Sequence, residues 1–440
     1  MRAVSRTRGV TSRLGVLGVV AATLAPAAGV PGDRTGVAGV HSPDPSIVRT
    51  VRLGFNPVSV LADQAAGRVL VFGYNPSGSV VALLDAATGM RVRALHLGRQ
   101  RFIPPEDGDP AAIDPVTGRV YLPTATASQA DGPPDGPCVV RVLDGRTGAT
   151  IQLIRAGYTP AGVALAARAP RLFVADNPRT DAAGRAIDAG GTRLIDLATA
   201  RLVRTLPDGA PLAVDERTGR VFLASSVGLD VRDAATGRSV ARVPFGGSDS
   251  IAPDAPVALA VDERAGRVVV ALSSNSGLSG GAVLDARIGR IVTQAAPVGS
   301  GPLAVDAGTG RALSVDLPLS STGGAVTATT FATRDGRAVH TVTLDTVSSR
   351  GVAAAVVIDA HSGHALVAWE RVNGAVLTPT LITIVDLHSG RPVHSFALDD
   401  QPSAVDTFGP PAMAIDGRTR RAFATNYGAS TVSVLDTTRL

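Results

Sequence analysis

Short apolar runs separated by turn residues recur along the whole chain. Apolar and polar positions alternate plainly in Ile47–Leu53 and in Val339–Leu344, which is the period-two pattern of a half-buried β-strand. After the first residues, Gly and Pro interrupt the chain too often for long helices to form. The pattern therefore predicts an all-β protein.

Two phrases alternate along the sequence. The first is a short Ala/Val-rich run, an Asp, a few turn residues, Gly-Arg and an apolar run. Its copies begin at Asp63, Asp114, Ala166, Asp215, Asp262, Asp306, Asp359 and Asp416. The second phrase is an apolar run followed by a turn such as Asp85-Ala-Ala-Thr-Gly89. Asp and Thr oxygens bond nearby backbone N–H groups and Gly accepts a positive φ, so each phrase indicates strand, turn, strand.

The first phrase advances 353 residues in seven steps, about 50 residues per unit. Four strands per unit, repeated eight times, predict a single β-propeller of eight four-stranded blades, with seven blades and an open solenoid as the alternatives. The last unit stops after its third strand, Thr431–Asp436, whereas an unpaired strand, Ile47–Leu53, precedes the first unit. Pairing the two would close the ring and remove a sheet edge. We expect the propeller to span residues 47–440.

The final unit, Arg421–Asp436, contains Ala-Thr-Asn followed by Thr-Val-Ser-Val-Leu-Asp. It resembles the YVTN-repeat (YncE-like) β-propeller family, whose repeat joins a strand ending in Thr-Asn to a Thr-Val-Ser-Val-Ile-Asp strand. The resemblance extends more loosely over residues 47–440, and the count of eight departs from the family's usual seven blades. It implies exported or cell-surface binding and scaffold roles, without an agreed catalytic motif.

The N-terminus has the layout of a secretory signal. Residues 1–13 contain four arginines and no acidic residue. An apolar run follows at Leu14–Ala25, and the small residues up to Ala27 are suited to cleavage. The run is too short to span a bilayer comfortably. We expect a signal peptide over residues 1–27, a linker over 28–46, and an exported protein (secreted, cell-surface or periplasmic) with no transmembrane anchor once the signal is removed.

The basic charge of the chain belongs mostly to this leader. All 42 basic residues are arginine, against 37 acidic residues, so the formal net charge is +5. Removing the four arginines of residues 1–27 leaves 38 against 37, a net of +1. We therefore expect no nucleic-acid partner, because the mature chain lacks a basic excess.

Several chemistries are excluded by residues that the sequence lacks. Without lysine there is no Schiff base, and no Gly-x-Ser-x-Gly elbow occurs. One tryptophan and one cysteine argue against an eight-bladed quinoprotein dehydrogenase, whose repeats the Leu-Asp-Ala-Ala-Thr-Gly phrase resembles. Cys138, the single cysteine, is expected to be a small core residue rather than a reactive thiol.

One face of the propeller has connections of variable length. The turns within each phrase are short, whereas the other connections include Gly98–Asp109, Pro123–Pro137, Asp176–Gly190, Gly246–Ala255 and Asp399–Pro410. Loops of free length on a rigid scaffold often carry function, although tolerated surface insertions would look the same. We expect this face to bind the partner.

In each unit, the second strand begins at the arginine of Gly-Arg or its equivalent and should end about five residues later. We expect the residue at that end to point to the channel mouth on the variable face. The polar or aromatic residues at this position, together with Glu370 next to Trp369, are the candidate binding residues: Asp176, Asp316, Trp369, Glu370 and Asn426. Their oxygens are typical ligands for calcium or could provide a carboxylate base. Because they are spread over several blades, individual turn caps are the simpler interpretation.

Histidines gather in the seventh unit, at His361, His364, His388 and His394. A zinc or copper site is the alternative there, but His361 and His364 occupy positions that hold arginines in other units, as solvated turn residues would. No cofactor is expected, with calcium or another divalent metal as the alternative.

The sequence thus predicts a monomeric, exported β-propeller that binds a protein or a small molecule through its variable face. The alternative is a metal-dependent lactonase-type hydrolase with its site at the channel mouth.

Overall fold

The computed structural model describes residues 44–98, 100–102, 111–126, 137–180, 186–225, 228–245, 255–273, 279–296, 298–317, 324–347, 352–373, 376–377, 379–398, 403–404 and 411–440. The chain divides into Met1–Ser42 and Pro43–Leu440. The expected signal peptide, nearly all of the expected linker and much of the long connections lie outside the described residues. Among those that are described, the only helical element is a 3-10 turn, Thr437–Arg439, and no helix is long and apolar enough to cross a membrane.

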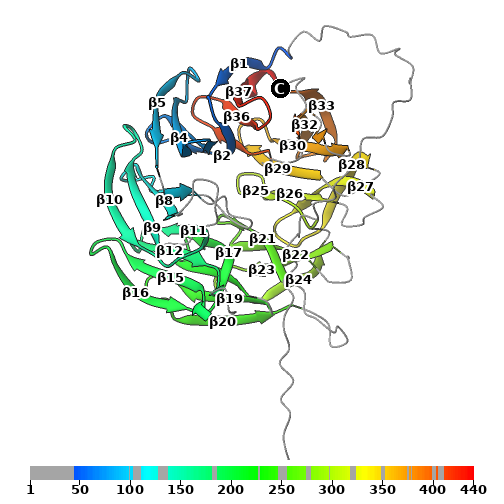
Figure 1. The fold of residues 1–440 in the computed structure, drawn as a ribbon. Helices are drawn as coiled ribbons and strands as arrows, with labels where there is room; N and C mark the ends of the chain where they lie inside the picture. The colour runs from blue at the N-terminus through cyan, green and yellow to red at the C-terminus, as the bar shows by residue number, and fades with distance from the viewer. Residues whose placement is uncertain are drawn as a thin grey trace, which may run out of the picture. The chain divides into compact units, whose positions relative to one another are not determined.

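Eight antiparallel blades form a ring, and each contains four main strands, which in blades one to seven follow the chain outward from the centre (Figure 1). Blade one contains β2 (Asn56–Asp63), β3 (Arg68–Asn75), β4 (Gly78–Asp85) and β5 (Arg91–His96). Blade two contains β7 (Ala112–Ile113), β8 (Arg119–Thr126), β9 (Cys138–Asp144) and β10 (Thr150–Arg155). Blade three contains β11 (Pro160–Ala166), β12 (Arg171–Asp176), β15 (Gly191–Asp196) and β16 (Arg201–Leu206). Blade four contains β17 (Gly209–Asp215), β18 (Arg220–Ser225), β19 (Gly228–Asp233) and β20 (Ser239–Pro244).

The second half of the ring repeats this order. Blade five contains β21 (Ala255–Asp262), β22 (Arg267–Ser273), β23 (Ser279–Asp285) and β24 (Ile291–Ala296). Blade six contains β25 (Leu303–Asp306), β26 (Arg311–Asp316), β27 (Gly324–Ala332) and β28 (Ala338–Val347). Blade seven contains β29 (Val352–Asp359), β30 (His364–Asn373), β32 (Leu381–Asp386) and β33 (Pro392–Ala397). Short strands in the connections are β6 (Gln100–Phe102), β13 (Arg179–Thr180), β14 (Ala186–Asp188), β31 (Val376–Leu377) and β34 (Ser403–Ala404).

Blade eight is built from both ends of the described chain. Its strands are β35 (Met413–Asp416), β36 (Arg421–Asn426), β37 (Thr431–Asp436) and β1 (Ile47–Arg52). β1 pairs antiparallel with β37, from Ile47 opposite Leu435 to Arg52 opposite Thr431. The predicted closure and the predicted count of eight blades are both confirmed. The pairing covers the edge of β37 and fastens the two ends of the ring to each other, which protects the ring from fraying there.

The hydrophobic core consists of eight clusters, each packed between two neighbouring blades. Adjacent residues of one strand serve different clusters: in β3, Val69 faces blade eight and Leu70 faces blade two. The second and third strands are thus buried on both faces, which explains their continuous apolar runs. Cys138 lies buried in the cluster between blades two and three, where burial raises the pKa of its thiol.

The short turns that join the first to the second strand and the third to the fourth strand of each blade lie on one side of the ring, which we call the turn face. The opposite side carries the connections of variable length, and we call it the variable face. On the turn face, a buried aspartate ends most of the innermost strands and caps the following turn. Asp215, for example, accepts hydrogen bonds from the backbone N–H groups of Arg217 and Thr218 at 2.9 and 3.0 Å. The carboxylate satisfies donors that the tight turn leaves without a backbone acceptor.

An arginine at the start of the second strand links two blades. The Arg220 Nη1 lies 3.3 Å from Asp233 Oδ2 in its own blade, and its Nε donates to the carbonyl of Arg287 in the next blade at 3.1 Å. A planar guanidinium serves both directions at once, which a lysine ammonium would not. The same two contacts define the inter-blade arginines Arg68, Arg171, Arg220 and Arg267.

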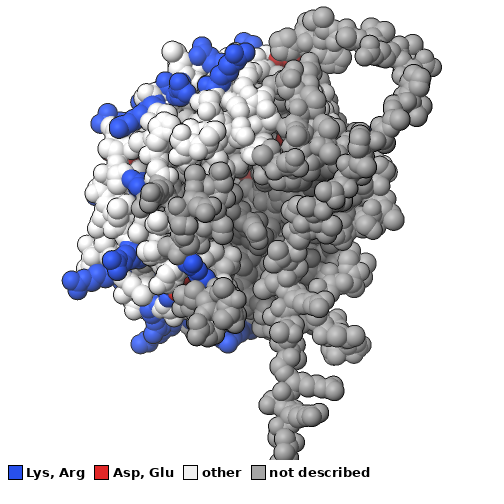
Figure 2. All heavy atoms as spheres, in the orientation of Figure 1, with Lys and Arg blue, Asp and Glu red and all other residues white. Residues whose placement is uncertain are grey.

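The outer strands face solvent. Figure 2 shows arginine side chains, in blue, along the outer edge of the described surface, with few acidic side chains between them. Most residues of β5, β10 and β16 are exposed. A charged, basic edge discourages the pairing of exposed strands with other chains.

Candidate functional site

Asp176 and Asp316 end the second strands of blades three and six, and both cap a loop of their own blade. Asp176 accepts hydrogen bonds from the backbone N–H groups of Tyr158, at 3.1 Å, and Thr159. Asp316 accepts from the backbone N–H and the hydroxyl of Ser300, each at 3.1 Å. These contacts agree with the turn-cap interpretation of the two aspartates.

Asn426 ends the second strand of blade eight and is buried. Its Nδ2 donates to the hydroxyls of Thr431 at 2.9 Å and Ser433 at 3.0 Å. Both partners lie on β37, so the amide joins two strands of the same blade.

Trp369 and Glu370 lie within β30 rather than at its end, because this strand continues to Asn373. Trp369 packs in the cluster between blades six and seven with 4% of its surface exposed, and its indole N–H donates to Thr383 Oγ1 at 3.2 Å. Glu370 is also buried and accepts a hydrogen bond from the hydroxyl of Thr380. Burial raises the pKa of Glu370. Both side chains are interior residues.

The centre of the ring holds a cavity of about 410 Å³ whose lining residues all have apolar side chains. The innermost strands of blades one to five supply residues such as Leu61, Val163 and Leu212. None of the described residues that line this cavity is charged. The five predicted residues are therefore not gathered around it, and each is bonded within its own blade.

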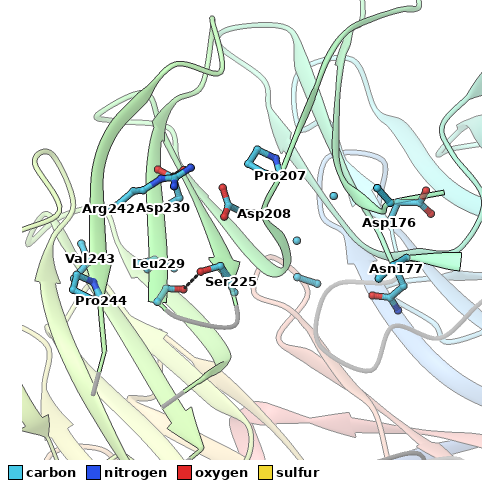
Figure 3. A pocket seen from close by; sticks show the side chains of 17 residues that line it. Asp176, Asn177, Pro207, Asp208, Ser225, Leu229, Asp230, Arg242, Val243 and Pro244 are labelled. Carbon is cyan, nitrogen blue, oxygen red and sulfur yellow. Dashed lines mark hydrogen bonds and ion pairs between the residues drawn. The ribbon is translucent and has the colours of Figure 1, made fainter. Parts of the chain in front are cut away.

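The variable face carries a pocket of about 680 Å³ between blades three and four, which we call the variable-face pocket (Figure 3). Strand ends of blade four and the connection from β16 to β17 form most of its wall. Figure 3 shows Asp208 between Asp230 and Arg242 on one side and Asp176 and Asn177 on the other. Of the five predicted residues, only Asp176 lines this pocket.

Glycines shape the wall of the variable-face pocket. Gly228 has a φ of +154°, and a Cβ there would lie 2.1 Å from the carbonyl oxygen of Val243, so no other residue fits. Gly209 is the opposite case. A Cβ at Gly209 would meet nothing within 4 Å, and its φ lies outside the left-handed region, so a larger side chain would project into free space without strain.

A buried ion cluster stands in the wall of this pocket. Arg232 Nη2 lies 2.5 Å from Asp230 Oδ2 and 3.1 Å from Asp208 Oδ2. The Arg242 Nε lies 3.3 Å from Asp230 Oδ2, and the hydroxyl of Ser239 donates to Asp230 Oδ1 at 2.6 Å. These contacts hold both carboxyl groups in one orientation.

The two carboxyl groups of the cluster also interact with each other. Burial raises the pKa of Asp208, and a hydrogen bond to the carboxyl of Asp230 raises it further, against the opposing effect of Arg232. The carboxyl group of Asp208 therefore takes up a proton more readily than a solvated carboxylate would.

A second group of ions lies on the blade-three side of the pocket. The Arg193 Nη2 is 3.3 Å from Asp176 Oδ2 and 2.5 Å from Asp188 Oδ2. Burial raises the pKa of Asp176, while the N–H groups of Tyr158 and Thr159 and the guanidinium of Arg193 oppose that shift. The cap residue Asp176 is thus fixed by contacts behind the pocket wall.

Sequence reasoning missed Asp208, Asp230, Arg232 and Arg242. One signal was available for Arg232. It directly precedes the aspartate of the second phrase, where the other seven units have Leu, Ile, Val or Phe. A cation at a position that is otherwise apolar and buried indicates a local ion cluster, because a buried charge needs partners. Asp208 lies in a connection and carried no such signal.

The histidines of blade seven do not form a metal site in the described part of the chain. His361 Nδ1 lies 3.6 Å from Asp359, and His394 Nε2 lies 2.6 Å from Asp44 near the N-terminal strand. Over the described residues, no group of three or more His, Cys, Asp or Glu side chains is placed to hold a metal ion.

No protein-family model and no curated protein matches the chain. Among solved structures, hydrazine synthase from Kuenenia stuttgartiensis is 15% identical with a TM-score of 0.50, over 88% of this chain and 97% of that chain. The dihydro-heme d1 dehydrogenase NirN in complex with DHE is 15% identical with a TM-score of 0.52, over 83% of this chain and 69% of that chain. Likeness at this identity shows the fold alone. Together with the sheet order, it shows that the chain is an eight-bladed β-propeller.

Proposed function

We propose that the protein is an exported β-propeller that binds a small, neutral ligand rich in hydroxyl groups in the variable-face pocket. The observation that carries the proposal is the set of carboxyl groups in the pocket wall that partly or fully buried arginines hold in place. Asp176 is held by Arg193, and Asp208 and Asp230 are held by Arg232. Acceptors fixed in this way lose little freedom when a ligand binds, which favours affinity.

The charges in the pocket lining and directly bonded to it favour a neutral ligand. Asp176, Asp208, Asp230 and Arg242 line the pocket, and Asp188, Arg193 and Arg232 are their ion-pair partners, which gives four carboxyl groups against three guanidinium groups in all. A strongly charged ligand would meet no net attraction there, whereas hydroxyl groups can both donate to carboxylates and accept from Arg242.

Size and position agree with this proposal. A volume of about 680 Å³ lies within the range of roughly 300–1,000 Å³ that is usual for small-molecule pockets. The pocket opens on the face with the variable connections, where binding residues are most often found. Its wall also presents small residues, among them Gly191, Gly209 and Gly228, which bring backbone groups within reach of a ligand.

Export and a YVTN-type binding role belong to the same proposal. Support comes from the leader-like residues 1–27 and from the Thr-Asn and Thr-Val-Ser-Val-Leu-Asp sequences of the last unit. Mass spectrometry of the protein recovered outside the cytoplasm tests the export. We expect a mature chain that lacks residues 1–27, and an intact N-terminus would contradict it.

The metal-dependent hydrolase is the alternative function. Its expected donors Asp316, Glu370 and Asn426 are each bonded inside a separate blade, and the described residues that line the central cavity have only apolar side chains. This placement favours the variable-face pocket over the channel mouth. Lactone hydrolysis that depends on added calcium or zinc would establish the alternative.

A blocking variant gives the main experiment. Neutral mono- and disaccharides are titrated into the protein by calorimetry, with an amine and a carboxylate of similar size as charged comparisons. Gly209→Leu fills the pocket at a position where a Cβ has free space. Gly280→Leu is the matched control, because it also has free space and no positive φ but lies in blade five.

We expect saturable binding of at least one saccharide, lost in Gly209→Leu and kept in Gly280→Leu. Equal binding by both variants would place the site elsewhere. Binding of the amine alone would replace a neutral ligand with a cationic one.

A further inference from the structure

The outer strands carry their charge unevenly around the ring. One arginine belongs to the repeat, because it directly follows the turn before the outer strand in blades three to seven: Arg201, Arg238, Arg290, Arg337 and Arg391. Beyond that position, the outer strands of blades eight, one, two and three carry six arginines and no acidic residue. We call these six the basic arc: Arg49, Arg52, Arg91, Arg93, Arg155 and Arg204.

The other half of the ring has no such excess. Beyond the repeat position, the outer strands of blades four to seven carry one arginine, Arg242, and one acid, Asp345. Arg242 is paired with Asp230 in the variable-face pocket. None of the six arginines of the basic arc lines that pocket, so the arc is independent of the function proposed above.

The basic arc is continuous and open to solvent. All six arginines are exposed. The Arg91 Nη1 donates to the carbonyl of Leu53, at the end of β1 in blade eight, and the Arg93 Nη1 donates to the carbonyl of Thr147, in a turn of blade two, both at 3.0 Å. The arginines of blade one thus reach the blades on both sides, so no gap separates the four outer strands.

The basic arc has no counter-charge within the described part of the chain. None of its six arginines forms an ion pair there, although acids adjoin the same strands. Asp44 contacts His394, and Asp144 accepts a hydrogen bond from the hydroxyl of Thr147. The other three are paired with arginines of second strands: Asp85, Asp196 and Asp436.

Protection of the sheet edges does not explain this distribution. A charged edge keeps an outer strand from pairing with other chains, and all eight outer strands need that protection equally. Six arginines in one half of the ring against one in the other half therefore indicate a partner that contacts the first half.

The position of the basic arc restricts what that partner is. Four neighbouring blades of eight cover half of the circumference, so a flat membrane would meet only part of the arc at once. Duplex DNA resists bending over about 150 base pairs, which is far too stiff to follow a ring of this size. The four outer strands contain no Phe, Tyr or Trp on which the bases of a single-stranded nucleic acid could stack.

We propose that the basic arc binds a linear anionic polysaccharide that follows the outer strands of blades eight, one, two and three. A flexible chain can bend around the ring, and its sulfate, phosphate or carboxylate groups pair with guanidinium groups in two-point contacts. The half-exposed Val92, Ile151 and Leu202 lie on the same strands and offer apolar contacts to the C–H faces of sugar rings.

Double variants that each remove two positive charges provide the test. Arg49→Gln/Arg52→Gln neutralises the blade-eight end of the basic arc, and Arg155→Gln/Arg204→Gln neutralises the opposite end. Arg290→Gln/Arg391→Gln is the matched control, because it removes two exposed arginines of the repeat position in blades five and seven. Heparin fragments of defined length are titrated into each protein by calorimetry, with neutral dextran, single-stranded DNA and phosphatidylglycerol vesicles as comparisons.

We expect saturable heparin binding that weakens as salt rises, since binding releases counterions. A long fragment should bind about tenfold more weakly to each of the two arc variants and with unchanged affinity to the control. A tetrasaccharide, which reaches fewer blades, should bind more weakly than the long fragment. Thermal unfolding should be the same for all four proteins, because the substituted side chains have no partner among the described residues.

Three results would overturn the proposal. Equal weakening by the control variant would show a response to net charge rather than to the arc. Tighter binding of single-stranded DNA than of a heparin fragment of similar length would replace the polysaccharide with a nucleic acid. Binding of vesicles without binding of heparin would replace it with a membrane.

Discussion

The two faces of the propeller are built by different rules. On the turn face, the same contacts recur from blade to blade, with buried aspartates capping the turns and arginines linking neighbours. On the variable face, one pocket in blades three and four depends on an ion cluster around Arg232 that no other blade's second phrase can form. The contacts that recur in many blades maintain the ring. The ion cluster around Arg232 occurs in one blade only, and we propose that its residues serve ligand binding.

This difference makes departures from the repeat informative. A turn-face residue that follows the pattern has a structural explanation, so it carries no functional weight. A residue that breaks the pattern requires another reason. Arg232, in an otherwise apolar position, marks the ion cluster of the variable-face pocket.

The largest expected effect tests whether the ion cluster around Arg232 stabilises blade four through its charges. Asp230→Ala leaves Arg232 and Arg242 without their shared carboxylate. We expect a loss of about 3 kcal/mol in the free energy of unfolding, because the buried Arg232 loses its shorter ion pair and keeps only Asp208 as a counter-charge. Urea unfolding measures it.

The double variant Asp230→Ala/Arg232→Leu restores the apolar position found in other blades and should recover most of that loss. A double variant as unstable as the single one would show that the cluster does not act through its charges.

The next effect compares two aspartates within blade four. Asp215→Ala removes a buried cap and leaves two backbone donors unsatisfied, which should cost about 2 kcal/mol. Asp233→Ala removes a more exposed turn contact and should cost about 1 kcal/mol or less. Chemical denaturation of both variants checks the order, and a reversed order would contradict the structural role of the buried caps.

A smaller effect tests the links between blades. Arg267→Lys cannot keep both the contact with Asp285 and that with the carbonyl of Arg334, so it should cost about 1 kcal/mol. Arg311 holds the same position in blade six, but Ala332 stands opposite it in place of the aspartate, so Arg311→Lys loses no such ion pair and should leave stability nearly unchanged. Equal losses in thermal unfolding would mean that Arg311 is bonded in the folded protein after all.

The smallest effect concerns pH. Hydrogen bonds from Thr438 and the nearby Arg421 lower the pKa of Asp436 to about 2 against the burial that raises it. Its folded pKa lies below the unfolded value, so its contribution to stability is present above about pH 4 and is lost as the pH falls toward 2. Asp436→Asn should flatten this part of the stability profile.

Glu370 should change stability with pH in the direction opposite to Asp436. Burial raises its folded pKa, so protonation adds stability as the pH falls through that value. Glu370→Gln should therefore be more stable than the wild type at pH 7 and should lose the gain on acidification. Melting temperatures across the pH range test both variants, and parallel profiles for wild type and variants would contradict the assigned shifts.

The sequence was sufficient for the architecture because each unit repeats its turn chemistry. Asp, Thr and Gly at fixed spacing identified the strands, and the incomplete last unit with the unpaired strand at Ile47–Leu53 predicted the closure. The repeat did not predict the length of each strand equally well. β36 ends at Asn426 as expected, but β30 runs on past Trp369, so that side chain lies in the core.

The site was less accessible to sequence reasoning. Asp176 was found because it ends a strand of ordinary length. Asp208 and Asp230 are 22 positions apart, and only the turn of the chain from blade three into blade four brings their carboxyl groups together. Contacts between blades depend on how the blades pack against each other, and the apolar and polar pattern of one strand does not predict that packing.

Hydrogen–deuterium exchange with a saturating saccharide, identified by the calorimetric titrations, tests the central claim most directly. The account predicts slower exchange of the backbone amides around Asp208, Gly228–Asp230 and Arg242, with no change around Asp316, Glu370 and Asn426. Protection of the second group without the first would place the ligand at the channel mouth and contradict binding in the variable-face pocket.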